Sequence, residues 1–266
     1  MELRVDGQPV FAATGGRDFD PALPAVVFVH GAGMDHTVWA LQTRWFAWHD
    51  HAVLAVDLPG HGKSGGAALR TIDDIAGWLL RLIAASGAGQ AAMVGHSMGA
   101  LAALAAAARG PDAVRALALL GVGAKMPVHP DLLAAAKSGD PAVRASAWDL
   151  IVAWGFGRPA HFGLNRAPGL WMQGGGRSLL ARGAPGVLGN DLAACDAYSD
   201  ALDAASKVVC PTLIVCGDRD QMTPPKAAAP LGAAIERART VVIPAAGHMM
   251  MVEKPDETLD ALIGEL

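Results

Sequence analysis

The feature that most constrains the fold of this chain is an alternation of short apolar runs with helix-like stretches. Each apolar run ends in Gly, Pro, Asp or His, a pattern typical of buried parallel strands. The alternation predicts an α/β fold, with a doubly wound, mostly parallel sheet flanked by helices and right-handed crossovers. We expect the functional groups at the carboxyl ends of the strands. The predicted strands are residues 25–31, 51–60, 91–97, 114–123, 211–218 and 240–248, and the predicted helices are residues 36–48, 71–85, 98–109, 224–237 and 254–266.

Two segments depart from the alternation. The first residues, ELRVDGQPVFAAT, predict an antiparallel hairpin that turns at Asp6 and Gly7. A later segment, residues 124–207, has four predicted helices and no convincing strand, and it is too long for a plain loop. We therefore expect residues 1–123 and 208–266 to form the core and residues 124–207 to form an inserted helical lid.

Composition and charge exclude several classes of partner. The chain has 266 residues, 52% of them hydrophobic, and a net charge of -4. This composition is typical of soluble globular proteins. Its Lys and Arg residues form no basic stripe, so we expect neither nucleic acid nor a membrane surface as a partner. The charged start MELRVDGQPV argues against a signal peptide, and we expect a cytoplasmic protein. A homodimer is compatible with the sequence.

The three cysteines, Cys195, Cys210 and Cys216, are an odd number and lack the paired spacing of a metal site. Cys210 and Cys216 lie in or beside a predicted buried strand, where small apolar thiols are common. A reducing compartment fits this pattern best.

Ser97 lies in the stretch VGHSMGA, where a predicted strand ends and a predicted helix begins. Gly95 and Gly99 flank it in the pattern G-x-S-x-G. A sharp turn at this junction strains the backbone, and the glycines remove side chains that would clash. The hydroxyl then stands exposed while the following helix points NH groups at whatever the hydroxyl attacks. The stretch is therefore a candidate nucleophile elbow.

A serine hydroxyl needs a base within hydrogen-bond reach and a third group that orients the base. Asp220, in GDRDQMTP, follows the predicted strand 211–218, and His248, in AAGHMMMVEKP, ends the last apolar run. Both therefore emerge at the same sheet edge as Ser97. Asp218 is an alternative acid. The chain order Ser, Asp, His differs from the orders of the chymotrypsin and subtilisin groups.

Taken together, these motifs resemble those of the alpha/beta-hydrolase superfamily, in the branch that holds serine esterases, perhydrolase-type haloperoxidases and C–C bond hydrolases. HGAGMDHTVW resembles the oxyanion segment and DLPGHGKS resembles the D-x-x-G-x-G-x-S turn, while VGHSMGA, GDRDQMTP and AAGHMMMVEKP resemble the nucleophile, acid and histidine blocks. The resemblance covers nearly the whole chain. It implies acyl transfer with Ser97 as nucleophile, His248 as base and Asp220, which fits the acid block better than Asp218, as acid.

The negative charge that develops on the substrate carbonyl oxygen needs two hydrogen-bond donors in place. We expect one from the backbone NH of Met98, directly after the nucleophile, and one from the backbone NH of Ala32, after His30 and Gly31. Gly33 is the reserve candidate for the second donor.

The substrate is expected to be a small molecule, a carboxylic ester or thioester of a small to medium acyl group. Five arginines of the predicted lid could bind a carboxylate or a carrier group, so substrates that carry such a group remain an alternative. Two other functions stay open: a C–C bond hydrolase of diketone-like acids, and a ligand-sensing module that turns over very slowly. The apolar pocket is expected from Trp154, Phe162, Trp171 and Met172, and the arginines are Arg144, Arg158, Arg166, Arg177 and Arg182.

The remaining polar residues have structural explanations. His30 and His61 precede glycines in predicted turns, where we expect hydrogen bonds to backbone, and Asp57 and Ser64 are expected to pin the DLPGHGKS turn. His96 is expected to point away from the substrate side of the elbow. The pair His49 and His51 lacks a nearby third ligand, so we expect a solvated loop and predict neither a metal nor a cofactor.

Overall fold

The computed structural model describes residues 1–155 and 168–266, without the side chains of residues 168–171. One eight-stranded sheet has the order β1-β2-β4-β3-β5-β6-β7-β8. β1 (Glu2–Val5) and β2 (Gln8–Ala13) form the predicted hairpin, and β2 joins β4 antiparallel. The other strands are parallel, which confirms the predicted fold class. They are β3 (Ala25–Val29), β4 (Ala52–Val56), β5 (Ala91–His96), β6 (Val114–Leu120), β7 (Thr212–Gly217) and β8 (Ala238–Ile243).

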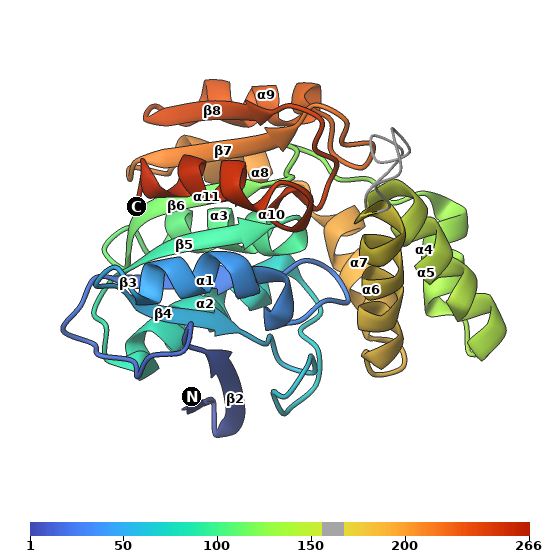
Figure 1. The fold of residues 1–266 in the computed structure, drawn as a ribbon, viewed down its shortest axis with the longest axis horizontal. Coiled ribbons are helices and arrows are strands. Elements are labelled where there is room, and N and C mark those ends of the chain that lie inside the picture. Colours follow the sequence, from blue (N-terminus) through green and yellow to red (C-terminus); the bar gives the residue numbers. More distant parts are fainter. Residues whose placement is uncertain (156–167) are drawn as a thin grey trace.

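Helices cover both faces of the sheet (Figure 1). Thr71 caps the first helix of one face, because its side chain accepts a hydrogen bond from the backbone NH of Asp74. A short 3-10 helix, His36–Trp39, leads into the first helix of the other face. One layer holds α2 (Ile72–Ser86), α3 (Met98–Arg109), α8 (Ala201–Ser206) and α9 (Pro225–Ala234), and the other holds α1 (Ala40–Ala47), α10 (Met250–Glu253) and α11 (Pro255–Ile263).

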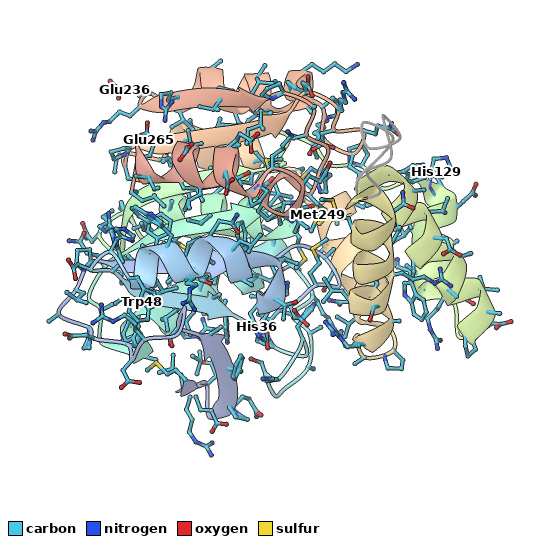
Figure 2. All side chains as sticks on the ribbon, in the orientation of Figure 1. His36, Trp48, His129, Glu236, Met249 and Glu265 are labelled. Atoms are coloured by element: carbon cyan, nitrogen blue, oxygen red, sulfur yellow. The ribbon has the colours of Figure 1, made fainter. Side chains whose placement is uncertain are left out.

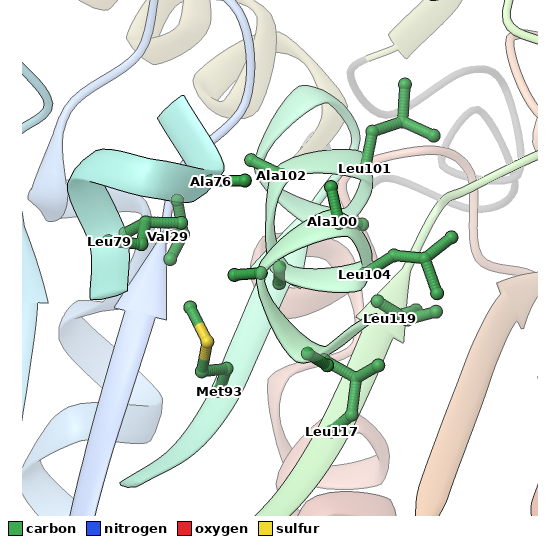
Figure 3. Close-up of a cluster of buried hydrophobic side chains, with 14 of the residues drawn as sticks. Val29, Ala76, Leu79, Met93, Ala100, Leu101, Ala102, Leu104, Leu117 and Leu119 are labelled. Carbon is green, nitrogen blue, oxygen red and sulfur yellow. The ribbon is translucent and has the colours of Figure 1, made fainter. Parts of the chain in front are cut away.

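The central strands are buried on both faces, because alternate side chains pack into opposite layers. In β3, Val27 and Val29 pack toward α2 and α3, whereas Val26 and Phe28 pack toward α1. Figure 3 shows part of the first layer, in which the small residues of α3 let that helix lie close to the strands. This close packing fixes where α3 begins, directly after Ser97.

The inserted segment, residues 124–207, contains α4 (Pro130–Lys137), α5 (Pro141–Gly155), α6 (Pro168–Arg182) and α7 (Val187–Ala197). These four helices lie together beyond the carboxyl ends of the parallel strands (Figure 1). Helix α8 is also within the segment but packs against α3, where Ala201 and Ala205 are fully buried. Among the described residues, no helix is long and apolar enough to cross a membrane.

Three predicted elements differ from the structure. The predicted helix 36–48 is a 3-10 turn followed by an α-helix, and the predicted helix 254–266 is preceded by the short α10. The expectation that every strand is buried is wrong for β8, in which Val242 keeps 48% of its surface exposed. β8 is the edge strand, and most of its residues lie outside the two core layers.

Candidate active site

Two neighbouring strand ends bring the central residues of the site together. β3 and β5 lie side by side, with Val29 paired to Gly95, although β4 separates them in the chain. The chain therefore leaves β3 toward one side of the sheet and returns on the other, and ligands of open α/β sheets bind at such a switch point. The segment after His30 and the turn at Ser97 consequently face the same space.

The backbone of Ser97 is strained in the way the elbow requires. Its φ is 54° and its ψ is −116°, a conformation that costs a non-glycine residue of the order of 1–3 kcal/mol. A Cβ at Gly95 would lie 2.3 Å from the carbonyl oxygen of Gly99, and a Cβ at Gly99 would lie 2.5 Å from that of His30. Both glycines are therefore required for the strand and helix to meet this closely, as the sequence predicts.

His248 and Asp220 form a buried hydrogen-bonded pair. Nδ1 of His248 donates to Oδ2 of Asp220 over 2.8 Å. The carboxylate also accepts hydrogen bonds from the backbone NH groups of Met222 and Thr223, each at 2.8 Å, and from the Thr223 hydroxyl at 2.7 Å. Burial alone would raise the pKa of Asp220, but the His248 charge and these hydrogen bonds outweigh it and hold the pKa well below its ordinary value. Asp220 is therefore an anion, and the alternative acid Asp218 is exposed.

Two further side chains hold the His248 loop, and sequence reasoning assigned this role to neither. Glu253 accepts hydrogen bonds from the NH groups on both sides of His248, those of Gly247 at 2.9 Å and Met249 at 3.0 Å. Nε2 of His96 donates to the His248 carbonyl over 3.0 Å, and the two rings lie 4.7 Å apart. Burial and the neighbouring His248 lower the pKa of His96 far below its ordinary value, so His96 is neutral.

The residues of the two predicted oxyanion donors both lie at the site, Met98 directly after Ser97 in the chain and Ala32 in the lining of the same cavity. Met98 is the first residue of α3, and its side chain is fully buried in the core, so its backbone NH is the group left to face a reacting carbonyl. Ala32 lines the same cavity as Ser97. The prediction of Gly33 as the reserve donor is wrong. Its NH donates to Oδ2 of Asp191 over 2.9 Å and is not available to a substrate.

A cavity of about 320 Å³ opens above Ser97 and His248. Its walls come from the sheet edge and from helices α4, α5 and α7. Figure 2 labels two residues of its lining, Met249 near α10 and His129 at the start of α4. The apolar lining includes Met126, Val128, Leu132, Ile151, Trp154 and Leu192.

The four predicted pocket residues have different outcomes. Trp154 lines the cavity. Met172 lies on α6 and is not part of the lining. No described residue of α6 contributes to the walls of this cavity. Phe162 and the side chain of Trp171 lie outside the part of the chain that the structure describes. Sequence reasoning did not predict Ile151 and Leu192 as pocket residues. In the sequence, each is only one apolar residue among many on the helices of the inserted segment.

Three of the predicted lid arginines have partners away from the cavity. Arg144 donates to the carbonyls of Ser138 and Gly139, each at 2.9 Å. Arg177 pairs with Asp149, and Arg182 lies 3.6 Å from Asp35. Arg158 and Arg166 lie outside the described residues. Within the described part of the chain, the cavity lining therefore contains no lysine or arginine.

Comparison with known proteins decides the family. The model of the alpha/beta hydrolase fold matches residues 24–255, a range that holds the elbow, the acid and the histidine. The chain belongs to the alpha/beta hydrolase family.

Relatives of this alpha/beta hydrolase include enzymes with different substrates. The (E)-2-((N-methylformamido)methylene)succinate hydrolase of Acinetobacter baylyi is 25% identical over 242 residues, covering 89% of this chain and 88% of the relative. The pimeloyl-[acyl-carrier protein] methyl ester esterase of Neisseria meningitidis is 30% identical over 250 residues, covering 85% and 72%. The solved structure of a thermophilic esterase is 29% identical with a TM-score of 0.77, covering 99% and 95%. These three relatives, two hydrolases that differ in substrate and one esterase, support a hydrolase.

In this alpha/beta hydrolase, hydrogen bonds of Asp57 and Ser64 hold the turn after β4. Asp57 Oδ1 accepts from the backbone NH and from Nδ1 of His36, each at 2.8 Å, and Oδ2 accepts from the NH of Lys63 at 2.8 Å. Ser64 donates to the Asp57 carbonyl at 2.6 Å and accepts from Phe11. Asp57 and Ser64 therefore pin the turn as predicted.

Asp35, His36 and Asp57 have the spacing of a possible metal site. Their ligand atoms are already used in hydrogen bonds, those of His36 and Asp57 with each other and that of Asp35 with the NH of Thr37.

Proposed function

We propose that this alpha/beta hydrolase cleaves carboxylic esters of uncharged, small to medium acyl groups through an acyl-enzyme on Ser97. The observation that carries the proposal is the joint placement of Ser97 and of His248, itself bound to Asp220, in the lining of one apolar cavity. This is the set of parts that serine acyl transfer needs: a nucleophile, a base and a group that orients the base.

The reaction would proceed in two halves. The Ser97 hydroxyl attacks the ester carbonyl carbon while His248 takes the hydroxyl proton, and Asp220 stabilises the imidazolium that forms. Because Nδ1 of His248 binds Asp220, Nε2 is the nitrogen that exchanges the proton. The alcohol leaves with that proton. Water then attacks the acyl-enzyme with His248 again as base, releasing the carboxylic acid and restoring Ser97. The NH groups of Ala32 and Met98 would bind the oxyanion.

Cys195 is a second nucleophile in the cavity lining, and its environment argues against a role in the reaction. Burial, with the charges of Asp191 and Asp196, raises the pKa of its thiol far above the ordinary value. A thiol attacks as the thiolate, so Cys195 stays unreactive near neutral pH. Ser97 is therefore the nucleophile of choice.

The preference for an uncharged acyl group comes from the lining. An ionised carboxylate in a buried site needs a cation or several donors to offset its desolvation. The described lining is rich in methionine and aliphatic side chains, and Arg144, Arg177 and Arg182 have partners elsewhere. The same feature argues against the alternative C–C bond hydrolase of diketone-like acids, whose substrates carry a carboxylate. The other alternative, a ligand-sensing module that turns over very slowly, is distinguished from an esterase by measuring turnover.

The test is a series of p-nitrophenyl esters of increasing acyl length, measured with the wild type and with Ser97→Ala. We expect turnover that depends on Ser97, higher with butyrate and hexanoate than with an ester of a dicarboxylic acid of the same length. Turnover no greater than that of Ser97→Ala on every ester would contradict the proposal and favour ligand sensing. A preference for the dicarboxylic ester would contradict the uncharged acyl group.

A further inference from the structure

Asp191, on helix α7 of the inserted segment, holds two segments of the core with one carboxylate. Its Oδ2 accepts a hydrogen bond from the NH of Gly33 over 2.9 Å and one from Nε2 of His61 over 2.7 Å. Gly33 belongs to the loop after β3, and His61 to the turn after β4. Asp191 is 1% exposed and His61 5% exposed, so water does not compete for these bonds.

The charge state of His61 follows from its neighbours. Nδ1 of His61 lies 3.0 Å from the carbonyl of Pro59, and Nε2 faces Asp191, so both ring nitrogens meet acceptors and both carry protons. Burial would lower the pKa of His61, but the hydrogen bond and charge of Asp191, with the Pro59 carbonyl and Asp57, outweigh it and raise the pKa. His30, whose ring lies 4.9 Å away, is neutral, because burial and His61 lower its pKa to about 4.

The bond to Gly33 bears on the oxyanion donors. Gly33 has a φ of +66° and directly follows Ala32, the proposed donor. The Gly33 NH lies in the peptide after Ala32, which is joined through the Ala32 Cα to the peptide that carries the donor NH, so a shift of the Gly33 amide turns the donor NH as well. Helices α6 and α7 press on the same glycine: a Cβ there would lie 2.9 Å from Leu188 and 3.2 Å from Leu180. The loop is thus held by a charge-assisted hydrogen bond on one side and by packing on the other.

We propose that Asp191, hydrogen-bonded to His61 and to the NH of Gly33, is a positioning residue that keeps the NH of Ala32 aimed at the reacting carbonyl. The proposal rests on the proposed function. A donor contributes to catalysis only if it lies where the oxyanion forms, so its misplacement lowers kcat more than it weakens substrate binding.

General anchoring of α7 does not require Asp191. Asn190 donates to the Leu69 carbonyl over 2.7 Å, and Asp196 accepts from the NH of Val128 over 2.9 Å. The first contact ties α7 to the segment between β4 and α2, and the second ties it to the segment before α4. Asp191 differs from both in reaching Gly33. This difference provides a matched control: Asp196→Asn makes the same chemical change on the same helix without touching that loop.

The test compares Asp191→Asn, His61→Gln, the double variant and Asp196→Asn. We expect Asp191→Asn and His61→Gln each to lower kcat about 10- to 100-fold, part of what a lost donor costs, with KM within about threefold. Because the two residues act as one unit, the double variant should lose little more than Asp191→Asn alone. Asp196→Asn should keep kcat within about twofold of the wild type.

Amide hydrogen exchange over residues 30–35 provides a readout that does not depend on activity. We expect faster exchange in Asp191→Asn than in the wild type, and wild-type exchange in Asp196→Asn. Should Asp191→Asn fail to fold, the same measurements on His61→Gln decide. A wild-type kcat in the Asp191 and His61 variants, or an equal loss in Asp196→Asn, would overturn the assignment. If the wild type hydrolyses no ester, the proposed function fails, and unchanged exchange would then overturn this inference as well.

Discussion

The Nδ1 atom of His248 donates a hydrogen bond to Oδ2 of Asp220 over 2.8 Å, although 28 residues separate the two in the chain. Asp220 follows β7 and His248 follows β8, and these two strands pair in parallel at the edge of the sheet. Asp220 thereby occupies Nδ1 and leaves Nε2 as the nitrogen that the proposed mechanism uses to exchange a proton with Ser97. The first prediction therefore concerns the loss of this hydrogen-bonded carboxylate.

Replacing Asp220 by Asn should lower kcat by about a thousandfold or more, because the amide no longer stabilises the imidazolium and favours the wrong tautomer. Asp218→Asn is the matched control, since Asp218 is two residues away and exposed. Steady-state hydrolysis of p-nitrophenyl butyrate by the two variants measures the difference. Equal losses, or a larger loss in Asp218→Asn, would identify Asp218 as the acid.

This pair was accessible to sequence reasoning for a physical reason. In a parallel sheet, residues that follow apolar runs collect at one edge, so the order of strands along the chain is enough to bring Ser97, Asp220 and His248 near one another. The hairpin at Asp6 and Gly7 was equally accessible, because its turn chemistry is local.

Other parts of the site could not be predicted in this way. Whether Met172 or Ile151 faces the cavity depends on how each inserted helix is rotated and docked, which the periodicity of a mostly apolar helix does not determine. The bond between Gly33 and Asp191 joins residues 158 positions apart through a helix outside the sheet. No local pattern marks such a contact, and the reserve role predicted for Gly33 failed for this reason.

The second prediction concerns the elbow and stability. Gly99→Ala would place a Cβ 2.5 Å from the carbonyl oxygens of His30 and Val29, both of them backbone atoms that cannot turn aside. We expect the free energy of unfolding to fall by about 3 kcal/mol or more. Gly174→Ala, in an exposed part of α6 with nothing within 4 Å of its Cβ, should instead stabilise by about 1 kcal/mol. Urea unfolding measures both, and equal effects would contradict the packing argument.

The third prediction is a pH dependence of stability caused by His30. Burial and the nearby His61 lower its folded-state pKa from 6.5 to about 4. Below pH 6.5 the unfolded chain takes up a proton that the folded protein excludes, so stability is lost as the pH falls from 6.5 toward 4. The loss from this group amounts to about 3 kcal/mol.

His30→Gln tests that dependence, because its side-chain oxygen can still accept the hydrogen bond that Nε2 of His30 receives from Leu58. The variant should lose less stability than the wild type between pH 6.5 and 4, as measured by urea unfolding at several pH values. Parallel curves for the two proteins would show that His30 does not carry the effect.

The fourth prediction concerns acyl chain length. Val128 is half-buried and lines the cavity, so Val128→Phe should narrow the space for the acyl group. We expect kcat/KM to fall about tenfold for p-nitrophenyl hexanoate and to change little for the acetate, a difference of the size that a few methylenes give in a pocket. Val143→Phe makes the same change on the exposed face of α5 and is the control. A uniform loss over all chain lengths would place the acyl group elsewhere.

The most direct measurement is the site of a covalent adduct. A fluorophosphonate reacts with a serine that an adjacent base activates, and the adduct remains on that residue for mass spectrometry. We expect one adduct, on Ser97, in the folded wild type and none in Ser97→Ala, with much slower labelling in His248→Ala. A folded wild type that stays unlabelled at Ser97 under conditions that label a known serine esterase would contradict Ser97 as the nucleophile.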